Sequence, residues 1–123
     1  MRVAGLPLDD KALADFYRAT REGDRAHDSG WVQVRVKLVE ASVVGEGGAE
    51  AVLAMIEDPN EKVRGAAAAA CVRLVDRFAR AESNPIGKVA SRLTREKDAV
   101  TRRRLLEAFR AVGPATWVEY STD

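Results

Sequence analysis

Cysteine and histidine are almost absent from this chain, which holds only Cys71 and His27. A lone cysteine cannot form an internal disulfide, and such chains are typical of reducing compartments, so we expect a cytoplasmic protein. Protein metal sites usually combine several Cys or His ligands at close spacing, and this sequence offers no such set. We therefore expect no metal and no cofactor.

Long hydrophobic runs and an excess of one charge are also missing. Residues 65–72 form an uncharged, mostly alanine stretch, far shorter than the about 18 to 20 apolar residues of a membrane helix. Residues 1–5 lack the apolar core of a secretion signal, so no membrane association is expected. The net charge of +1 argues against the chain as a whole being a nucleic-acid binder. At 46% hydrophobic residues, the 123 residues predict a single folded domain.

Aromatic residues make up only 6% of the chain, so valine, leucine and alanine must fill the core. Small core residues let helices approach closely, which favours an all-α fold. Apolar residues at helical spacing predict hairpins over residues 9–44, 49–81 and 85–112, followed by a tail over 113–123. The expected breaks between helices lie at residues 45–48, Asp58-Pro59-Asn60, Asn84-Pro85, residues 96–98 and Gly113-Pro114.

Residues 31–44 allow two interpretations. Val32, Val34, Val36 and Leu38 alternate with polar residues, as in a strand. Val32 and Val36 also combine with Val39 and Val43 into a stripe at helical spacing. We predict a helix, because every other expected element is helical and a lone strand would have no partner.

The second and third hairpins predict an internal repeat. Shifting residues 49–75 by 37 positions onto residues 86–112 aligns their apolar stripes without a gap. This shift pairs Val52 with Val89 and Val63 with Val100, and the repeat requires each pair to share its surroundings. A period near 37 residues lies in the range of two-helix solenoid repeats.

The segment from Asp58-Pro59 through Val63-Arg64 to the following alanines resembles the consensus of HEAT repeats. Strong resemblance covers residues 49–75, whereas the later unit has Thr101 at the arginine position and lacks the proline. The chain is similar to small bacterial HEAT-like domains. The resemblance implies a right-handed α-α superhelix of about three hairpins. It also implies a polar ladder between neighbouring repeats that uses Asp58 and Arg64.

Candidate catalytic groups are weak, so we predict that the chain is not an enzyme. His27 lies in an expected loop without a second metal ligand. Cys71 falls on a buried stripe, where a cysteine acts as a small hydrophobe. The glycines at 45–48 lack the Lys and Ser/Thr that a phosphate-binding loop requires, which favours a simple turn.

Charge separates the two halves of the chain. Residues 1–60 carry 7 basic and 11 acidic side chains, whereas residues 86–112 carry 8 basic and 3 acidic ones. Because neighbouring residues of a helix are about 100° apart, Arg102, Arg103 and Arg104 cannot share one face, and one of them is expected to lie along an interface. Charge runs usually mark solvated helix faces, with the arginines here paired to Glu96, Asp98 and Glu107.

The leading functional prediction is a non-catalytic protein–protein interaction module, a small scaffold or adaptor with an unidentified protein partner. Alternatives are nucleic-acid binding through the basic C-terminal pair, an inhibitor or immunity-type partner of a bacterial protein, and head-to-tail homo-oligomers. Tryptophan and arginine dominate binding hot spots, although core packing at the ends of the stack is the more ordinary role for the tryptophans. The predicted partner-binding residues are Arg64, Arg73, Arg102, Arg103, Arg110, Trp31 and Trp117.

Overall fold

The computed structural model describes residues 10–44, 49–78 and 85–120, with side chains placed for 12–44, 49–78 and 85–113. Every regular element in these ranges is helical, so the all-α prediction is confirmed, including the helix over residues 31–44. In chain order the elements are α1 (Asp10–Arg21), the 3-10 helix η2 (Gly23–Ala26), α2 (Ser29–Val44), α3 (Ala49–Met55), α4 (Glu61–Arg73), α5 (Val75–Phe78), α6 (Pro85–Arg95) and α7 (Ala99–Tyr120).

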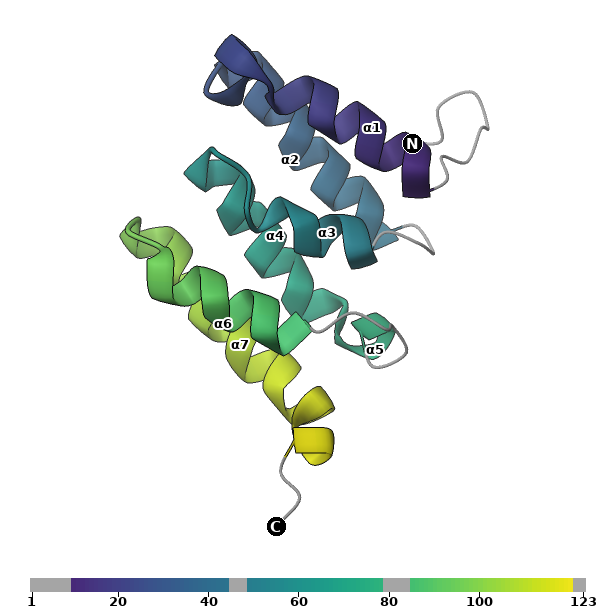
Figure 1. Ribbon diagram of the computed structural model, residues 1–123, viewed down its shortest axis with the longest axis vertical. Coiled ribbons are helices and arrows are strands. Elements are labelled where there is room, and N and C mark those ends of the chain that lie inside the picture. The colour runs from purple at the N-terminus through teal and green to yellow at the C-terminus, as the bar shows by residue number, and fades with distance from the viewer. Residues whose placement is uncertain (1–9, 45–48, 79–84, 121–123) are drawn as a thin grey trace.

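The helices pair into hairpins that stack on one another (Figure 1). α1 pairs with α2, α3 with α4 and α6 with α7, while the central α4 also packs against α2 and α7. α1, α3 and α6 form one layer, nearer the viewer in Figure 1, and α2, α4 and α7 form the other. The stack therefore has two broad faces, one for each layer.

Short polar side chains begin α2, α4 and α7. Asp28, Asn60 and Asp98 each accept a hydrogen bond from a backbone N–H of the first helical turn, at 3.1, 2.9 and 3.0 Å. These bonds satisfy N–H groups that have no carbonyl partner within the helix. Between α1 and η2 the chain turns through Gly23, whose φ of +58° favours glycine.

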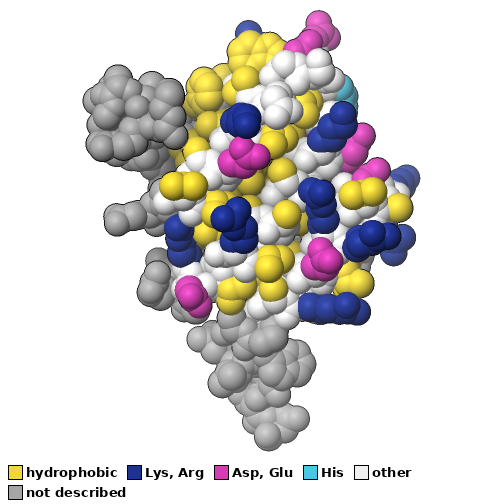
Figure 2. Space-filling model, turned by 180° about the vertical axis from the view of Figure 1, so that it is seen from behind, with side chains coloured by type: hydrophobic (Ala, Val, Ile, Leu, Met, Phe, Trp, Pro, Cys, Tyr) yellow, Lys and Arg dark blue, Asp and Glu magenta, His cyan; other side chains and the backbone are white. Residues whose placement is uncertain are grey.

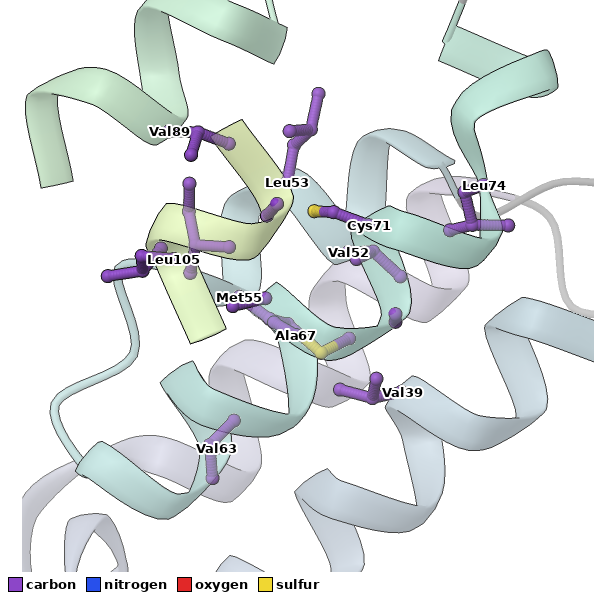
Figure 3. Close-up of a cluster of buried hydrophobic side chains, with 14 of the residues drawn as sticks. Val39, Val52, Leu53, Met55, Val63, Ala67, Cys71, Leu74, Val89 and Leu105 are labelled. Atoms are coloured by element: carbon purple, nitrogen blue, oxygen red, sulfur yellow. The ribbon is translucent and has the colours of Figure 1, made fainter. Parts of the chain in front are cut away.

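The core is built around α4 (Figure 3). Val63, Ala67 and Cys71 form a fully buried stripe along this helix. Alanines elsewhere on α4 let the neighbouring helices approach closely, and larger side chains from those helices fill the space between. The buried residues around α4 include Val39, Val52, Leu53, Met55, Leu74, Val89 and Leu105.

The predicted repeat register holds for the first helix of each pair and is wrong for the second. Val52 and Val89 are both 0% exposed, as predicted, but Val63 is 0% exposed and Val100 is 60% exposed. Residues 38 positions apart share their burial instead, as in the pairs Val63–Thr101, Ala67–Leu105 and Leu74–Val112. The cause is one extra residue before α7, since five positions separate Leu93 from the cap Asp98 and four separate Ile56 from the cap Asn60. An ungapped comparison cannot detect that insertion.

The helix predicted from residue 61 to 81 is interrupted. α4 ends at Arg73, Leu74 is non-helical, and α5 follows. The Arg77 guanidinium donates hydrogen bonds to the last carbonyls of α2, at 3.0 and 2.8 Å. Leu74 and Phe78, on either side of the break, are both buried. Residues 79–81 lie outside the described residues.

α7 is longer than predicted. The expected stop at Gly113-Pro114 is wrong, because the helix runs on to Tyr120. Because proline has no backbone N–H, Pro114 removes one hydrogen bond from the helix. A helix can continue past such a gap at the cost of local distortion. Among the helices that the structure describes, α7 included, none combines the length and apolar character of a membrane span.

Two neighbouring leucines test this packing. Leu105 is 0% exposed and Leu106 is 38% exposed. We expect Leu105→Ala to lower the free energy of unfolding by about 2–5 kcal/mol, because it leaves a cavity in the core. The matched control Leu106→Ala should cost less than about 1 kcal/mol. Urea denaturation followed by circular dichroism measures both, and equal losses would contradict the register given above.

Candidate partner-binding face

A buried arginine joins the first hairpin to the second. Arg35 of α2 is 0% exposed, and its Nη2 donates to the Ala26 carbonyl at 2.6 Å. Nη1 donates to the carbonyls of Thr20 and Arg25. Nε lies 2.9 Å from Asp58 Oδ2, an ion-pair contact rather than an aligned hydrogen bond. The positive charge is thus enclosed by backbone carbonyls and one carboxylate.

Asp58 serves several elements at once. Its Oδ2 accepts a 2.6 Å hydrogen bond from the Tyr17 hydroxyl of α1, and its Oδ1 accepts one from the Asn60 N–H at 2.9 Å. Burial, together with this bond and the negative charge of Asp58, raises the pKa of Tyr17. The Asp58 carbonyl accepts a 2.9 Å bond from Arg64, which carries the network on toward the third hairpin.

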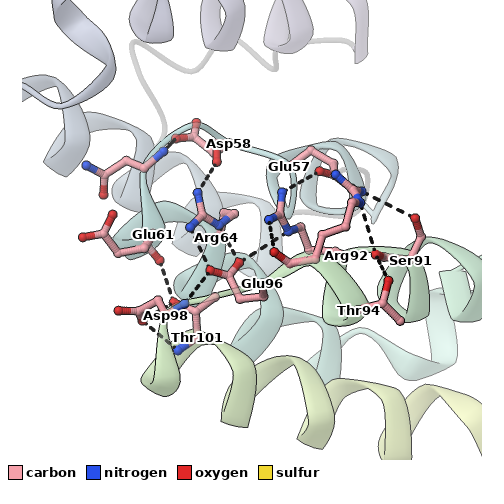
Figure 4. Close-up of polar contacts among 12 residues, drawn as sticks. Glu57, Asp58, Glu61, Arg64, Ser91, Arg92, Thr94, Glu96, Asp98 and Thr101 are labelled. Carbon is pink, nitrogen blue, oxygen red and sulfur yellow. Dashed lines mark hydrogen bonds and ion pairs between the residues drawn. The ribbon is translucent and has the colours of Figure 1, made fainter.

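Arg64 and Glu96 continue the network (Figure 4). Arg64 Nε and Nη2 donate to the two Glu96 carboxylate oxygens at 2.6 and 2.8 Å. The Asp98 N–H donates to the same carboxylate at 3.2 Å, and Arg92 Nε lies 3.4 Å from it. Although burial raises the pKa of Glu96, the bonds from Arg64 and Asp98 and the charges of Arg64 and Arg92 outweigh burial and lower it. The Thr101 hydroxyl lies 2.8 Å from Asp98 Oδ2 and 3.1 Å from the Glu61 carbonyl, so its one hydrogen has two acceptors within reach.

We call the chain of contacts through Arg35, Asp58, Arg64 and Glu96 the polar ladder. Arg64, predicted to face a partner, has a side chain that is only 13% exposed, and its guanidinium is bound within the ladder. Arg35 is not among the residues predicted from the sequence. Its position in the stripe Val32–Arg35–Val39, a charge among valines at helical spacing, was the available signal.

A groove lies on the layer formed by α2, α4 and α7. It has a volume of about 280 Å³, and no residue of α1, α3 or α6 lines it. Its floor and walls are aliphatic, and three charged side chains stand at its edges. We call it the alanine groove; its lining residues are Val36, Val39, Glu40, Val43, Ala66, Ala69, Ala70, Arg73 and Arg104.

Arg104 also lines a second groove, between α4 and α7. The second groove is about 330 Å³ and includes Glu61, Lys62 and Asp98 among its lining residues. Arg104 lines both, and its stem lies over Gly65, where an added Cβ would be 3.6 Å from Arg104 Cδ. Arg104 is therefore the member of the arginine triplet that lies along an interface. Figure 2 views this layer and shows basic side chains among hydrophobic ones, gathered toward the α7 side.

The structure separates the predicted partner-binding residues. Arg73 lines the alanine groove, whereas Arg102, Arg103 and Arg110 are exposed on α7 outside it. No described residue forms an ion pair with the arginine triplet, so the expected pairing is wrong for Arg102, Arg103 and Arg104. Arg92 of the same basic helix pair does contact Glu96, with 3.4 Å between Nε and Oε1. Trp31 is 37% exposed and stacks under the Arg25 guanidinium at 4.8 Å, so its expected place in the core is also wrong. The Trp117 side chain lies outside the described residues.

The surroundings of the two candidate catalytic groups, Cys71 and His27, are those of ordinary structural residues. The Cys71 thiol is buried, which raises its pKa to about 12 and disfavours the thiolate that a nucleophile needs. His27 is exposed, with Nδ1 lying 3.0 Å from the Asn60 amide nitrogen. Among the described residues no group of three or more His, Cys, Asp or Glu is placed to hold a metal.

Comparison with known proteins leaves the family open. No protein-family model, curated protein or solved structure matches the chain.

Breaking the ladder at Arg35 should destabilise the protein strongly. We expect Arg35→Met to lower the free energy of unfolding by about 3–5 kcal/mol, because Asp58 is left as a buried unpaired charge. Adding Asp58→Asn should recover part of that loss. The surface variant Arg18→Met removes a contact to Asp15 between side chains 60% and 49% exposed, and should cost less than about 1 kcal/mol. Urea denaturation measures all three, and a small Arg35→Met effect would rule out the enclosed ion pair.

The lowered pKa of Glu96 predicts acid sensitivity. Because the folded-state pKa lies below the ordinary value of 4.5, Glu96 stabilises the fold above pH 4.5 and loses that contribution as the pH falls through its folded-state pKa. The bonds from the Thr101 N–H and hydroxyl lower the pKa of Asp98 too. Its contribution to stability is therefore also lost as the pH falls. Glu96→Gln should therefore be less stable than wild type at neutral pH, and the difference should narrow in acid. Urea denaturation at a series of pH values tests this, and a constant difference would contradict it.

Proposed function

We propose that this chain is a non-catalytic protein–protein interaction module that binds its partner on the layer of α2, α4 and α7. The observation that carries the proposal is the alanine groove, an aliphatic channel bordered by Arg73 and Arg104. Neither guanidinium forms an ion pair or hydrogen bond with a described residue. An apolar floor with charged edges is the usual make-up of a protein-binding surface.

The wider architecture supports this role. Stacked helix pairs present one helix per pair on a continuous surface, which suits extended partners. Asp58 contacts Arg35 of the first hairpin and Arg64 contacts Glu96 of the third, which supports a polar ladder of the kind that the resemblance to HEAT repeats implies. We therefore propose a HEAT-like, right-handed superhelix of three hairpins acting in the cytoplasm as a small scaffold or adaptor.

Nucleic-acid binding is the alternative function with a specific observation behind it. Arg102, Arg103 and Arg110 are exposed on α7, and phosphate backbones are bound by such side chains. The alanine groove favours a protein instead, because aliphatic side chains give phosphates nothing to replace their hydration.

Site-specific photocrosslinking tests the proposed face. A photoreactive phenylalanine analogue replaces Ala69 in the alanine groove, and as a matched control it replaces the exposed Ala14 of α1, in the other layer. In cells of the source organism we expect a discrete adduct from position 69 that is sensitive to protease and resistant to nuclease. Position 14 should give none. Equal adducts at both positions would remove the proposed face, and a nuclease-sensitive adduct would replace it with nucleic-acid binding.

A further inference from the structure

We infer that the alanine groove binds an acidic amphipathic helix. This helix would present small or aliphatic residues to the groove floor and two carboxylates, seven or eight residues apart, to Arg104 and Arg73. The inference rests on the proposed function and specifies the chemistry of the partner segment at the same site.

The floor of the groove calls for a helix rather than an extended strand. Valines of α2 and alanines of α4 make up the floor, and they offer no hydrogen-bond donor or acceptor from their side chains. An extended segment lying there would leave backbone N–H and C=O groups without partners, which costs free energy. A helix satisfies these groups internally. The small side chains of Ala66, Ala69 and Ala70 also let the partner's helix lie close to α4.

The charges at the edges call for carboxylates. Arg73 and Arg104 are exposed, and no described residue forms an ion pair with either guanidinium, so both remain open to an incoming carboxylate. The third charged edge residue, Glu40, already has a cationic partner in Lys37, with 3.5 Å between Oε1 and Nζ. The groove therefore attracts a negatively charged segment.

The positions of the two arginines set the spacing of the carboxylates. Arg104 Nη1 lies 3.6 Å from the site of a Cβ at Gly65, which places its guanidinium beside that residue of α4. Gly65 and Arg73 are eight residues apart on α4, or about 12 Å along its axis at the helical rise per residue. A helix lying along the groove matches that distance with acidic residues at positions i and i+7 or i+8.

Peptide selection tests this inference without knowledge of the natural partner. The purified full chain selects from a display library of random peptides of about 16 residues, long enough for about four helical turns. We expect enrichment of sequences with aliphatic residues at helical spacing and acidic pairs seven or eight positions apart. An enriched peptide is then titrated by fluorescence anisotropy against the wild type and the double variant Arg73→Glu/Arg104→Glu. The double variant should bind about tenfold more weakly, through loss of two attractions and gain of two repulsions.

Two controls separate local contacts from general attraction. The charge-matched variant Arg103→Glu/Arg110→Glu changes exposed arginines of α7 outside the groove and should change the affinity less than about threefold. A peptide with both carboxylates replaced by lysine should prefer Arg73→Glu/Arg104→Glu over the wild type. Circular dichroism of each protein verifies that the variants are folded.

Several results would overturn the inference. These are enrichment without acidic pairs, no enrichment, equal weakening by both double variants, or displacement of the peptide by a DNA duplex. If any of them accompanies a protein adduct at position 69, the acidic helix is wrong and the proposed face stands. If position 69 also gives no protein adduct, the proposed function fails as well.

Discussion

The stack depends on one buried carboxylate, that of Asp58. The turn between α3 and α4 places this side chain where α1, α2 and the start of α4 meet. Burying a carboxylate is costly unless opposite charge and hydrogen bonds replace its hydration. Those interactions come from Arg35, Tyr17 and the Asn60 N–H. Because Arg35 and Tyr17 belong to the first hairpin, their contacts with Asp58 fix the position of that hairpin on the second.

The same requirement recurs one hairpin further along. Glu96 lies in the turn before α7 as Asp58 lies in the turn before α4, and Arg64 reaches it from the preceding hairpin as Arg35 reaches Asp58. Arg35 and Arg64 occupy different turns of their helices, so the two contacts are chemically alike without being equivalent in sequence. Each join pairs an arginine with a turn carboxylate. The arginines used in this way are lost to partner binding, which explains why Arg64 is enclosed while Arg73 and Arg104 remain available.

Local sequence signals were sufficient for the helices and several of their boundaries. Asp58-Pro59-Asn60 ends one helix and caps the next through chemistry contained in those residues. The burial of Arg35 depends on carbonyls and a carboxylate contributed by other segments, which no local pattern reveals. The repeat spacing changes from 37 to 38 residues because of a single insertion. The burial of Val63 and the exposure of Val100 reveal that insertion. For the candidate site, the sequence indicated that arginines bind the partner. Only the packing shows that Arg64 is enclosed within the polar ladder, whereas Arg73 and Arg104 line the groove.

The opposite layer offers a useful contrast with the alanine groove. A hollow of about 600 Å³ between α3 and α6 is larger, and its lining includes Glu57 and Lys88. Glu57 is already held by Arg92 at 3.1 Å and Arg95 at 2.6 Å, so a ligand there competes with existing ion pairs. At the alanine groove, Arg73 and Arg104 have no such pairs with any described residue. Size alone would favour the hollow, but the free energy of binding depends on what must be desolvated and broken, and by that criterion the smaller groove is the better site.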